Sequence, residues 1–260
     1  MAEIARPDRF RILIIGRANA GKTTILRAVC GAEGEPNVYD QDGNEVHDFV
    51  ASQSDILCTH AFLQRGEHNI EYSLMFPNSP GFVFHDSRGF ESGAVEELAL
   101  VREFIRKKAN LGSMQNQLHA IWYCFSTDSN RFMTAAEKEF FDTIDTGTVP
   151  VIAIFTKFDA LDAAAFSALS EQGVPFAEAQ RRAPVHAQAQ FNQGLLPLIQ
   201  QLAHPPRAVV CLRSKVSILR AASELIEGTG ATLDGGALKV LLVQAQCVNV
   251  ELCMKGAVDR

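Results

Sequence analysis

A loop suited to phosphate chemistry lies near the start of the sequence. It has the spacing G-x-x-x-x-G-K-[ST] and consists of Gly16, Arg17, Ala18, Asn19, Ala20, Gly21, Lys22 and Thr23. Its glycines let the backbone bend until successive N–H groups face inward, where they bind an anion. In this pattern Lys22 reaches the β- and γ-phosphates of a nucleotide, and Thr23 coordinates Mg²⁺. We therefore expect nucleotide binding by these residues and the adjoining Thr24.

A second motif, D-x-x-G, lies in the stretch FVFHDSRGF. Asp86 ends an apolar run, and Gly89 follows three residues later. In nucleotide switches a carboxylate at this place joins the Mg²⁺ shell, and the glycine N–H senses the γ-phosphate. We therefore predict Asp86 as a metal ligand and Gly89 as a catalytic residue alongside Lys22.

A third motif, FTKFD, carries residues that can recognise a nucleobase. Asp159 can accept hydrogen bonds from guanine N1–H and from its 2-amino group. Adenine offers neither donor and would leave the buried carboxylate unpaired. Lys157 can lay its methylene stem across the base. Thr156 replaces the usual asparagine of N-K-x-D, and its hydroxyl can still tie this loop to the phosphate loop.

These motifs need a sheet that presents the ends of several strands together. Five short apolar runs, separated by helical patterns, predict buried parallel strands at 10–16, 82–86, 120–125, 149–156 and 207–212. Residues 68–76 alternate more and predict a hairpin with 82–86, near the sheet edge. Each motif lies at the end of one of the predicted strands. The pattern predicts an α/β fold with a doubly wound, mostly parallel six-stranded sheet and helical additions.

Helical patterns fill the intervals between the strands. We predict helices at 23–30, 94–109, 134–144, 160–169, 176–182, 195–203 and 237–254. Gly31 should end the first of them, and Thr134 with Glu137 forms a capping box at the start of the third. His85 and Trp122 fall inside predicted strands and are expected in the core.

The composition is that of an ordinary globular protein. The 260 residues have 47% hydrophobic content and a formal net charge of -6, which argues against non-specific binding to nucleic acid or anionic lipid. No uncharged apolar run reaches the roughly 18 residues of a membrane span, and residues 1–10 lack the apolar region of a signal peptide. The six cysteines form no C-x-x-C pair, which favours reduced, mostly buried thiols in a cytoplasmic protein.

The three motifs together resemble those of the translation-factor-related class of P-loop GTPases. Era-like, septin-like and immunity-associated GTPases look most similar, and HDSRGFESG and FTKFDAL also look like stretches of uncharacterised fungal G-domain proteins. The resemblance covers about residues 10–215 and implies a G domain over 1–215, with 216–260 as a C-terminal helical extension that packs on it or binds a partner. It implies binding of GTP or GDP with Mg²⁺, and hydrolysis of GTP as a molecular switch.

The resemblance also implies two further sites. The first switch of the class contains a threonine that closes on Mg²⁺ and the γ-phosphate. Candidates are Ser52, Ser54 and Thr59, of which we favour Thr59 as metal ligand and catalytic residue; an ordinary loop threonine is the alternative. The last base-contacting loop falls on Ser214 and Lys215. The phosphate state would order or release the segments around 50–66 and 86–93.

The sequence departs from the class at Phe90, where many switch GTPases carry a glutamine that orients water. Hydrolysis is therefore expected to be slow, or assisted by a partner or an ion. In some members an asparagine at the position of Asn19 helps to hold K⁺, often where two G domains meet, which implies a homodimer or a protein effector as partner. The alternative is that Asn19 only stabilises the loop turn. Arg17 is expected to be a solvated loop side chain.

Two other functions stay open from the residues. One is a nucleotide-bound interaction module with negligible hydrolysis, which Phe90 and the uncertain switch threonine favour. The other is an ATPase or a small-molecule kinase on the same phosphate loop, which Asp159 argues against. The C-terminal apolar stretch fits a partner-binding helix or one that packs on its own domain.

Overall fold

A central sheet organises the chain, seen in a computed structural model that describes residues 9–32, 34–46, 69–87, 95–109, 116–128, 133–213 and 218–246. In these ranges seven strands pair in the order β2-β3-β4-β1-β5-β6-β7. Their bounds are β1 Phe10–Gly16, β2 Asn37–Tyr39, β3 Ser73–Met75, β4 Phe82–Asp86, β5 Ala120–Ser126, β6 Val151–Thr156 and β7 Ala208–Cys211. Strands β1 and β4 to β7 run parallel to one another, and β3 pairs antiparallel with both of its neighbours, β2 and β4. The predicted fold class is confirmed.

The predicted count of six strands was wrong, because β2 adds a seventh. Strand β2 has only three half-buried residues in a polar stretch, too few to show an alternating pattern. The hairpin between β3 and β4 is present, with Leu74 opposite Phe84. However, β3 is shorter than the predicted 68–76, and β2 takes the outer edge position.

The parallel strands are buried on both faces, which explains their continuous apolar sequences. Successive residues of a strand point to opposite faces, so β1 feeds two cores. Ile12 and Ile14 join one cluster, and Leu13 and Ile15 join the other. His85 and Trp122 are buried as predicted.

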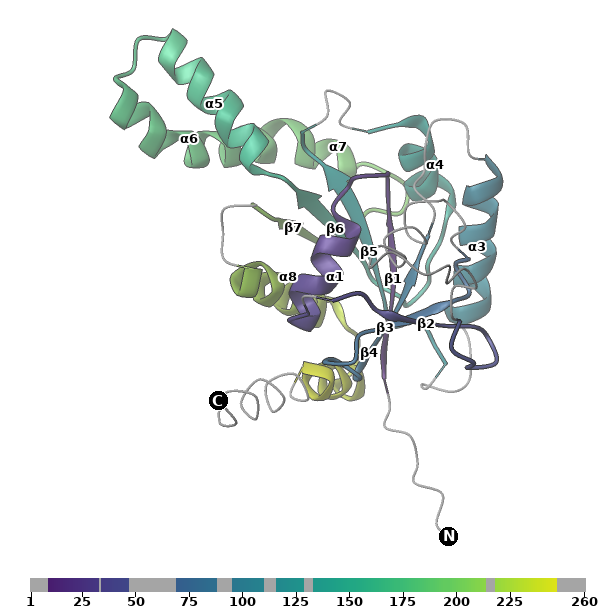
Figure 1. The fold of residues 1–260 in the computed structure, drawn as a ribbon. Helices are drawn as coiled ribbons and strands as arrows, with labels where there is room; N and C mark the ends of the chain where they lie inside the picture. Colours follow the sequence, from purple (N-terminus) through teal and green to yellow (C-terminus); the bar gives the residue numbers. More distant parts are fainter. Residues whose placement is uncertain are drawn as a thin grey trace, which may run out of the picture.

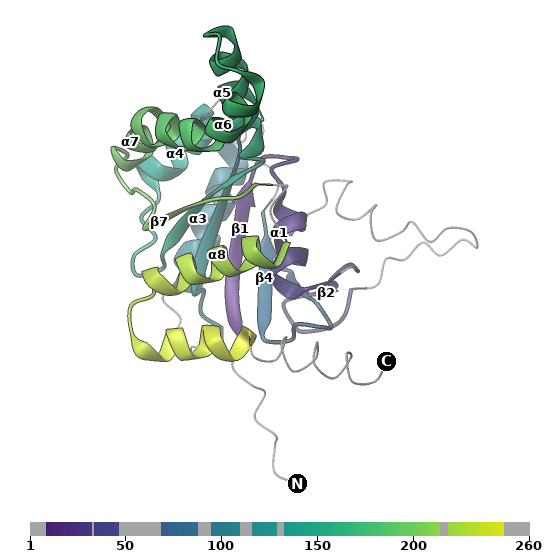
Figure 2. The same cartoon turned by 90° about the vertical axis from the view of Figure 1, so that its left-hand side faces the viewer.

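Helices cover both faces of the sheet (Figures 1 and 2). Their bounds are α1 Lys22–Cys30, α3 Val95–Ala109, α4 Ala135–Thr143, α5 Asp159–Glu171, α6 Phe176–Gln190, α7 Leu196–Gln200 and α8 Ile218–Thr232, with a π-helical turn η1 at Phe191–Leu195. Helices α1 and α8 share the first core cluster, and α3, α4 and α7 share the second. Gly31 ends α1 in the left-handed conformation, and the capping box of Thr134 and Glu137 starts α4, both as predicted.

Two helix predictions need correction. Helix α6 continues through Pro184 to Gln190, eight residues beyond the predicted end at Arg182, although a proline inside a helix removes one backbone hydrogen bond. Helix α8 was not predicted. A further helical segment runs over 236–246, and the rest of the predicted 237–254 helix lies outside the described residues.

The described residues beyond 217 pack on the sheet. Leu225 of α8 and Leu241 belong to the cluster that contains Ile12 and Ile14. A Cβ atom built on Gly81 would lie 2.6 Å from the Cα atom of Ala245, so the backbones approach closely there. The predicted domain boundary at 215 stays a prediction.

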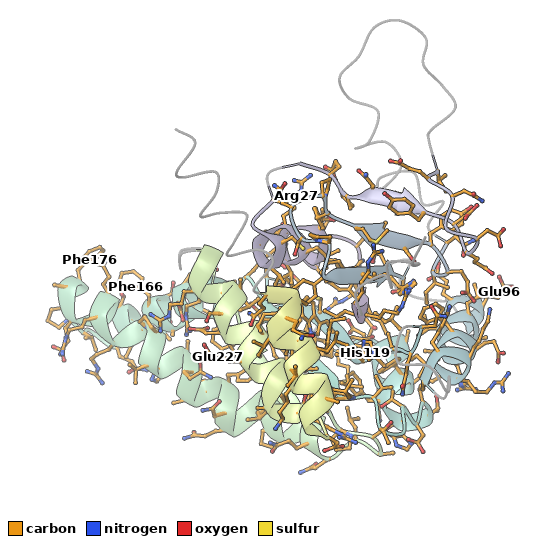
Figure 3. All side chains as sticks on the ribbon, turned by 90° about the horizontal axis from the view of Figure 1, so that it is seen from below. Arg27, Glu96, His119, Phe166, Phe176 and Glu227 are labelled. Carbon is orange, nitrogen blue, oxygen red and sulfur yellow. The ribbon has the colours of Figure 1, made fainter. Side chains whose placement is uncertain are left out.

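Helices α5 and α6 form a hairpin that projects from the sheet (Figure 1). Figure 3 shows Phe166 and Phe176 of this hairpin far from the strands. The two helices pack on each other through their own small cluster, made of Ala165, Leu169, Ala179, Ala183 and Ala187. We call this hairpin, residues 159–190, the α5–α6 arm.

Among the helices that the structure describes, none has both the length and the apolar character that crossing a membrane requires.

The described cysteines are free thiols: Cys30 and Cys124 are buried, and Cys211 is half-buried. Burial raises the pKa of the Cys124 thiol to about 12, so it stays protonated at neutral pH. The remaining three cysteines lie outside the described ranges.

Candidate functional site

The phosphate loop joins β1 to α1 at the carboxyl end of the parallel strands. Gly21 adopts a φ of 79° immediately before α1, a conformation that glycine reaches without a Cβ penalty. Gly16 is pressed against the neighbouring strand, because a Cβ atom there would lie 2.5 Å from the carbonyl oxygen of Cys124. Both glycines of the motif are therefore required by the backbone path.

Lys22 and Asp86 approach each other at this loop, from α1 and from the last residue of β4. The Lys22 Nζ atom donates to the carbonyl oxygen of Gly16 at 3.0 Å, and it lies 3.9 Å from Oδ1 of Asp86. Asp86 is 8% exposed. The structure thus brings together the lysine of the first motif and the carboxylate of the second, which are 64 positions apart in the printed sequence.

The exposed residues of the loop include Ala18, Asn19 and Thr24, while Thr23 is half-buried. Asn19 has a φ of 61°, in the left-handed region that asparagine tolerates better than most residues. This backbone conformation supplies a structural reason for Asn19, in agreement with the loop-stabilising alternative. It does not test whether the side chain helps to hold K⁺.

The FTKFD motif is tied to the phosphate loop through Thr156. Its hydroxyl donates to the carbonyl oxygen of Ala20 at 3.0 Å and lies 3.2 Å from that of Phe125. Thr156 is 5% exposed, so water competes little for this hydrogen bond. The tie that we expected from a threonine at this position is present.

Lys157 is held in an unusual conformation beside it. Its φ is 53°, which a residue with a side chain seldom adopts. Its Nζ atom donates to Oδ2 of Asp128 at 2.7 Å, and its carbonyl oxygen accepts from the Thr127 hydroxyl at 2.7 Å. Sequence reasoning missed Thr127 and Asp128, which follow β5 directly. Asp159 is the first residue of α5.

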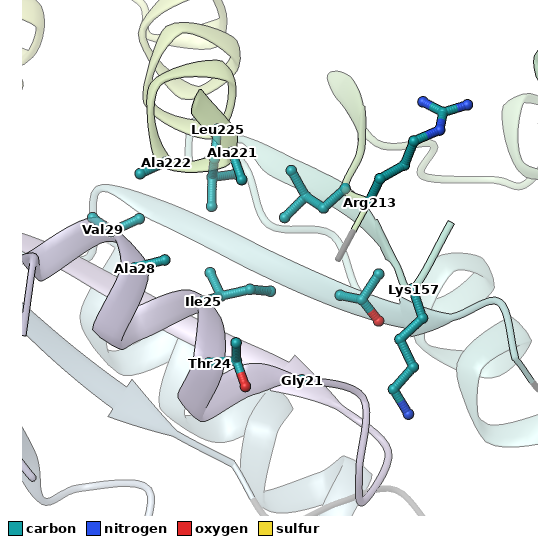
Figure 4. Close-up of a pocket in the computed structure, with 12 residues that line it drawn as sticks. Gly21, Thr24, Ile25, Ala28, Val29, Lys157, Arg213, Ala221, Ala222 and Leu225 are labelled. Atoms are coloured by element: carbon teal, nitrogen blue, oxygen red, sulfur yellow. The ribbon is translucent and has the colours of Figure 1, made fainter. Parts of the chain in front are cut away.

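A pocket of about 310 Å³ lies beside these residues (Figure 4). It is lined by Gly21, Thr24, Ile25, Ala28, Val29, Thr156, Lys157, Leu212, Arg213, Ala221, Ala222 and Leu225. Its volume falls within the range of small-molecule sites. The phosphate loop, the FTKFD motif and the segment after β7 all contribute to the lining, and α1 and α8 supply the remaining residues.

The expectation that Arg17 is a solvated side chain was wrong. Its Nε atom donates to Oε1 of Glu137 at 2.9 Å, and the Glu137 side chain is fully buried. The same carboxylate accepts from the backbone N–H of Thr134 at 2.7 Å. The capping box made Glu137 recognisable in the sequence. Its pairing with Arg17 could not be predicted, because Arg17 is 120 residues earlier.

We predict that Arg17→Met destabilises the fold by about 3 kcal/mol, because it leaves the Glu137 carboxylate buried without its cation. Replacing both partners, in Arg17→Met with Glu137→Gln, should recover part of that loss. Urea unfolding followed by circular dichroism measures both values. Arg182→Met, which breaks an exposed pair with Glu178, serves as the control and should change stability by less than about 1 kcal/mol. Equal losses in Arg17→Met and the control would contradict the prediction.

The oxygen donors of the loop suit Mg²⁺. Proteins commonly hold this ion through one or two side-chain oxygens together with substrate phosphates, and the Thr23 hydroxyl and the Asp86 carboxylate are such donors. In the described ranges no group of three or more histidine, cysteine or carboxylate side chains gathers as a metal cluster. A site of the Mg²⁺–phosphate type does not need one.

Several predicted site residues lie outside the described residues: Thr59 with the alternatives Ser52 and Ser54, Gly89, Phe90, Ser214 and Lys215. Their roles stay predictions. The described residues end at Ser87, two positions before Gly89, and at Arg213, directly before Ser214.

No protein-family model matches the chain, and no curated protein matches it. Among solved structures, it is similar to a putative nucleolar GTP-binding protein 1 from Plasmodium falciparum. The identity is 13%, the match covers 95% of this chain and 97% of that chain, and the TM-score is 0.39. It is also similar to two chains from structures of an oligomerised bacterial dynamin pair, at 13% and 12% identity with TM-scores of 0.45 and 0.44. The match covers 92% of this chain and spans 36% of each dynamin chain.

Proposed function

We propose that the protein binds GTP and GDP with Mg²⁺ and hydrolyses GTP to GDP and phosphate. One observation carries the proposal: the Thr156 hydroxyl joins the FTKFD motif to the carbonyl oxygen of Ala20. This hydrogen bond fixes the segment that would read a base against the loop that would hold phosphates. The pocket beside them, which α1 and α8 also line, has a volume suited to a nucleobase.

Each group then has a role that its position supports. Lys22 and the inward backbone N–H groups of the loop offset the charge of the β- and γ-phosphates. Thr23 and Asp86 would hold Mg²⁺, which supplies charge stabilisation at the phosphates. Asp159 would select guanine by accepting from N1–H and the 2-amino group, while a water molecule attacks the γ-phosphorus and GDP leaves.

The proposal is tested by single-turnover GTP hydrolysis with excess protein, in K⁺ buffer and in Na⁺ buffer. We expect slow conversion of bound GTP to GDP, and loss of GTP binding by at least about 100-fold in Lys22→Ala, since the ammonium directly opposes phosphate charge. Lys138→Ala, an exposed lysine of α4, is the matched control and should bind like the unaltered protein. Binding of ATP as tightly as GTP would contradict the guanine assignment.

The same experiment separates the two roles of Asn19. Asn19→Gly keeps the left-handed backbone and removes the side-chain oxygen. If Asn19 helps to hold K⁺, turnover is faster in K⁺ than in Na⁺ and this difference disappears in the variant. If Asn19 only stabilises the turn, the two buffers give the same rate.

The second candidate function, a nucleotide-bound interaction module with negligible hydrolysis, is favoured by the α5–α6 arm. The arm projects from the sheet (Figure 3), and its Phe176 and Val185 side chains are 70% and 74% exposed. Exposed apolar side chains on a projecting element suit a protein effector. Tight GTP binding with no turnover in either buffer would support this candidate over the enzyme.

A further inference from the structure

The segment after β7 is joined to the FTKFD motif by backbone hydrogen bonds that extend the sheet. The N–H of Leu212 donates to the carbonyl oxygen of Phe155 at 2.7 Å, and the N–H of Phe158 donates to that of Leu212 at 2.9 Å. These bonds bracket Thr156 and Lys157. The two segments that line one end of the pocket therefore form a single backbone unit.

Arg213 adds a side-chain connection to the same unit. Its Nε and one terminal guanidinium nitrogen donate to the two carboxylate oxygens of Asp162 on α5, at 2.8 and 3.2 Å. Such a two-bond pair fixes orientation as well as distance. Both side chains are sheltered, with 24% exposure for Arg213 and 18% for Asp162, so solvent screens the pair less than it screens a surface pair.

The guanidinium of Arg213 also lies over the ring of Phe158, 4.7 Å from its centroid. Phe158 is fully buried, and its ring also packs against that of Phe191, with 5.2 Å between the ring centroids. Arg213 thus contacts the residue before Asp159 through the ring, and the residue three positions after it through the ion pair. Asp159 begins α5 between these two contacts.

The ion pair with Asp162 keeps the Arg213 side chain positively charged. The hydrogen bonds that the guanidinium donates to Asp162 raise the pKa of Arg213 above its already high ordinary value. Figure 4 shows Arg213 and Lys157 at the end of the pocket away from Val29. The pocket wall at this end therefore includes, beside Lys157, a cation that is anchored to α5.

We propose that Arg213 is a positioning residue for guanine selectivity, because its clamp on Phe158 and Asp162 fixes Asp159 at the start of α5. This inference rests on the proposed function, in which Asp159 reads the base. A carboxylate discriminates steeply between bases only when it is held at hydrogen-bonding distance and angle. Loosening the clamp should therefore weaken the preference for guanine, while Lys22 and the phosphate loop continue to bind the phosphates.

The experiment compares the dissociation constants of GDP and ADP, with Mg²⁺, by isothermal titration calorimetry. In Arg213→Met we expect the ratio of ADP to GDP dissociation constants to fall at least tenfold, through weaker GDP binding, with ADP binding within twofold. Arg213→Lys keeps the charge but loses the two-bond geometry and the planar contact with the ring. It should recover only part of the ratio.

Two further variants keep the proposal open to contradiction. Asp162→Asn should also lower the ratio of ADP to GDP dissociation constants, although Arg213 is unaltered. The double variant with Arg213→Met should lower this ratio little further, because both substitutions remove the same ion pair. If Asp162→Asn leaves the ratio unchanged, Arg213 does not act through the clamp and the inference is overturned. Arg207→Met is the matched control: it breaks the pair with Asp234 at the opposite end of β7 and should leave the ratio unchanged.

The outcomes distinguish this inference from the proposed function. An unaltered protein that binds ADP as tightly as GDP contradicts both. An unaltered protein that prefers GDP, with an unchanged ratio in Arg213→Met, contradicts only the inference. A purely structural role would weaken GDP and ADP binding equally and lower the melting temperature, and that result also overturns it. If Arg213→Met does not fold, Asp162→Asn alone decides.

Discussion

Asp159→Ala is expected to abolish the preference for guanine. The substitution removes an acceptor of two charge-assisted hydrogen bonds, each worth roughly 1.5–3 kcal/mol. The loss in GTP affinity should be about 3 kcal/mol or more, on the order of 100-fold, while ATP affinity is unchanged or rises slightly. Competition binding of GTP, ITP and ATP against a fluorescent nucleotide measures the change.

ITP sharpens this test because hypoxanthine keeps N1–H and lacks the 2-amino group. The unaltered protein should rank GTP above ITP and ITP above ATP, and Asp159→Ala should bring the three together. Glu171→Ala, at the other end of α5 and exposed, is the control and should keep the original ranking. A ranking that survives Asp159→Ala would show that another group reads the base.

Gly16→Val should unfold much of the protein population, because no space exists for a side chain at this position. A Cβ atom on Gly16 would lie 2.5 Å from the Cys124 carbonyl oxygen and 2.9 Å from its Cβ, and both strands lie in the middle of the sheet. Neither backbone can move without disturbing the pairing of β1 with β5. We expect a loss of about 4 kcal/mol in the free energy of unfolding.

Gly31→Ala is the matched control for that substitution. Gly31 has a φ of 57° with open space around its Cβ position, so alanine there should lose only about 1 kcal/mol, the cost of the left-handed backbone. Chemical unfolding of the two variants in parallel gives the comparison. A loss in Gly16→Val no larger than that in Gly31→Ala would mean that the strands can separate to make room.

The parts of the fold that were predictable are those with strong local patterns. The continuous apolar run of β1 and the capping box of Thr134 and Glu137 each contain their own evidence within a few residues. Strand β2 does not, because three residues without alternation resemble a loop. Helix α8, Ile218–Thr232, was not predicted.

The site shows the same division. The spacing of the phosphate loop alone was enough to predict roles for Lys22 and Gly16, which stay predictions. In contrast, the partners Glu137 of Arg17, Asp128 of Lys157 and Asp162 of Arg213 are 120, 29 and 51 positions away from them. Nothing in a single sequence pairs such residues, because the pairing depends on which strand ends become neighbours. Local spacing predicted the candidate groups of the site, and only the folded sheet showed which side chains contact them.

The α5–α6 arm has a consequence for the cooperativity of folding. The fully buried residues between its helices are four alanines and one leucine, with Leu161, Phe166 and Val174 packed against them, so the arm buries little apolar area per residue. This cluster is separate from the two cores that flank the sheet. The arm therefore has its own small free energy of local opening, well below that of global unfolding. Native-state hydrogen exchange should therefore give lower opening free energies for the amides of the arm than for those of the sheet and its covering helices.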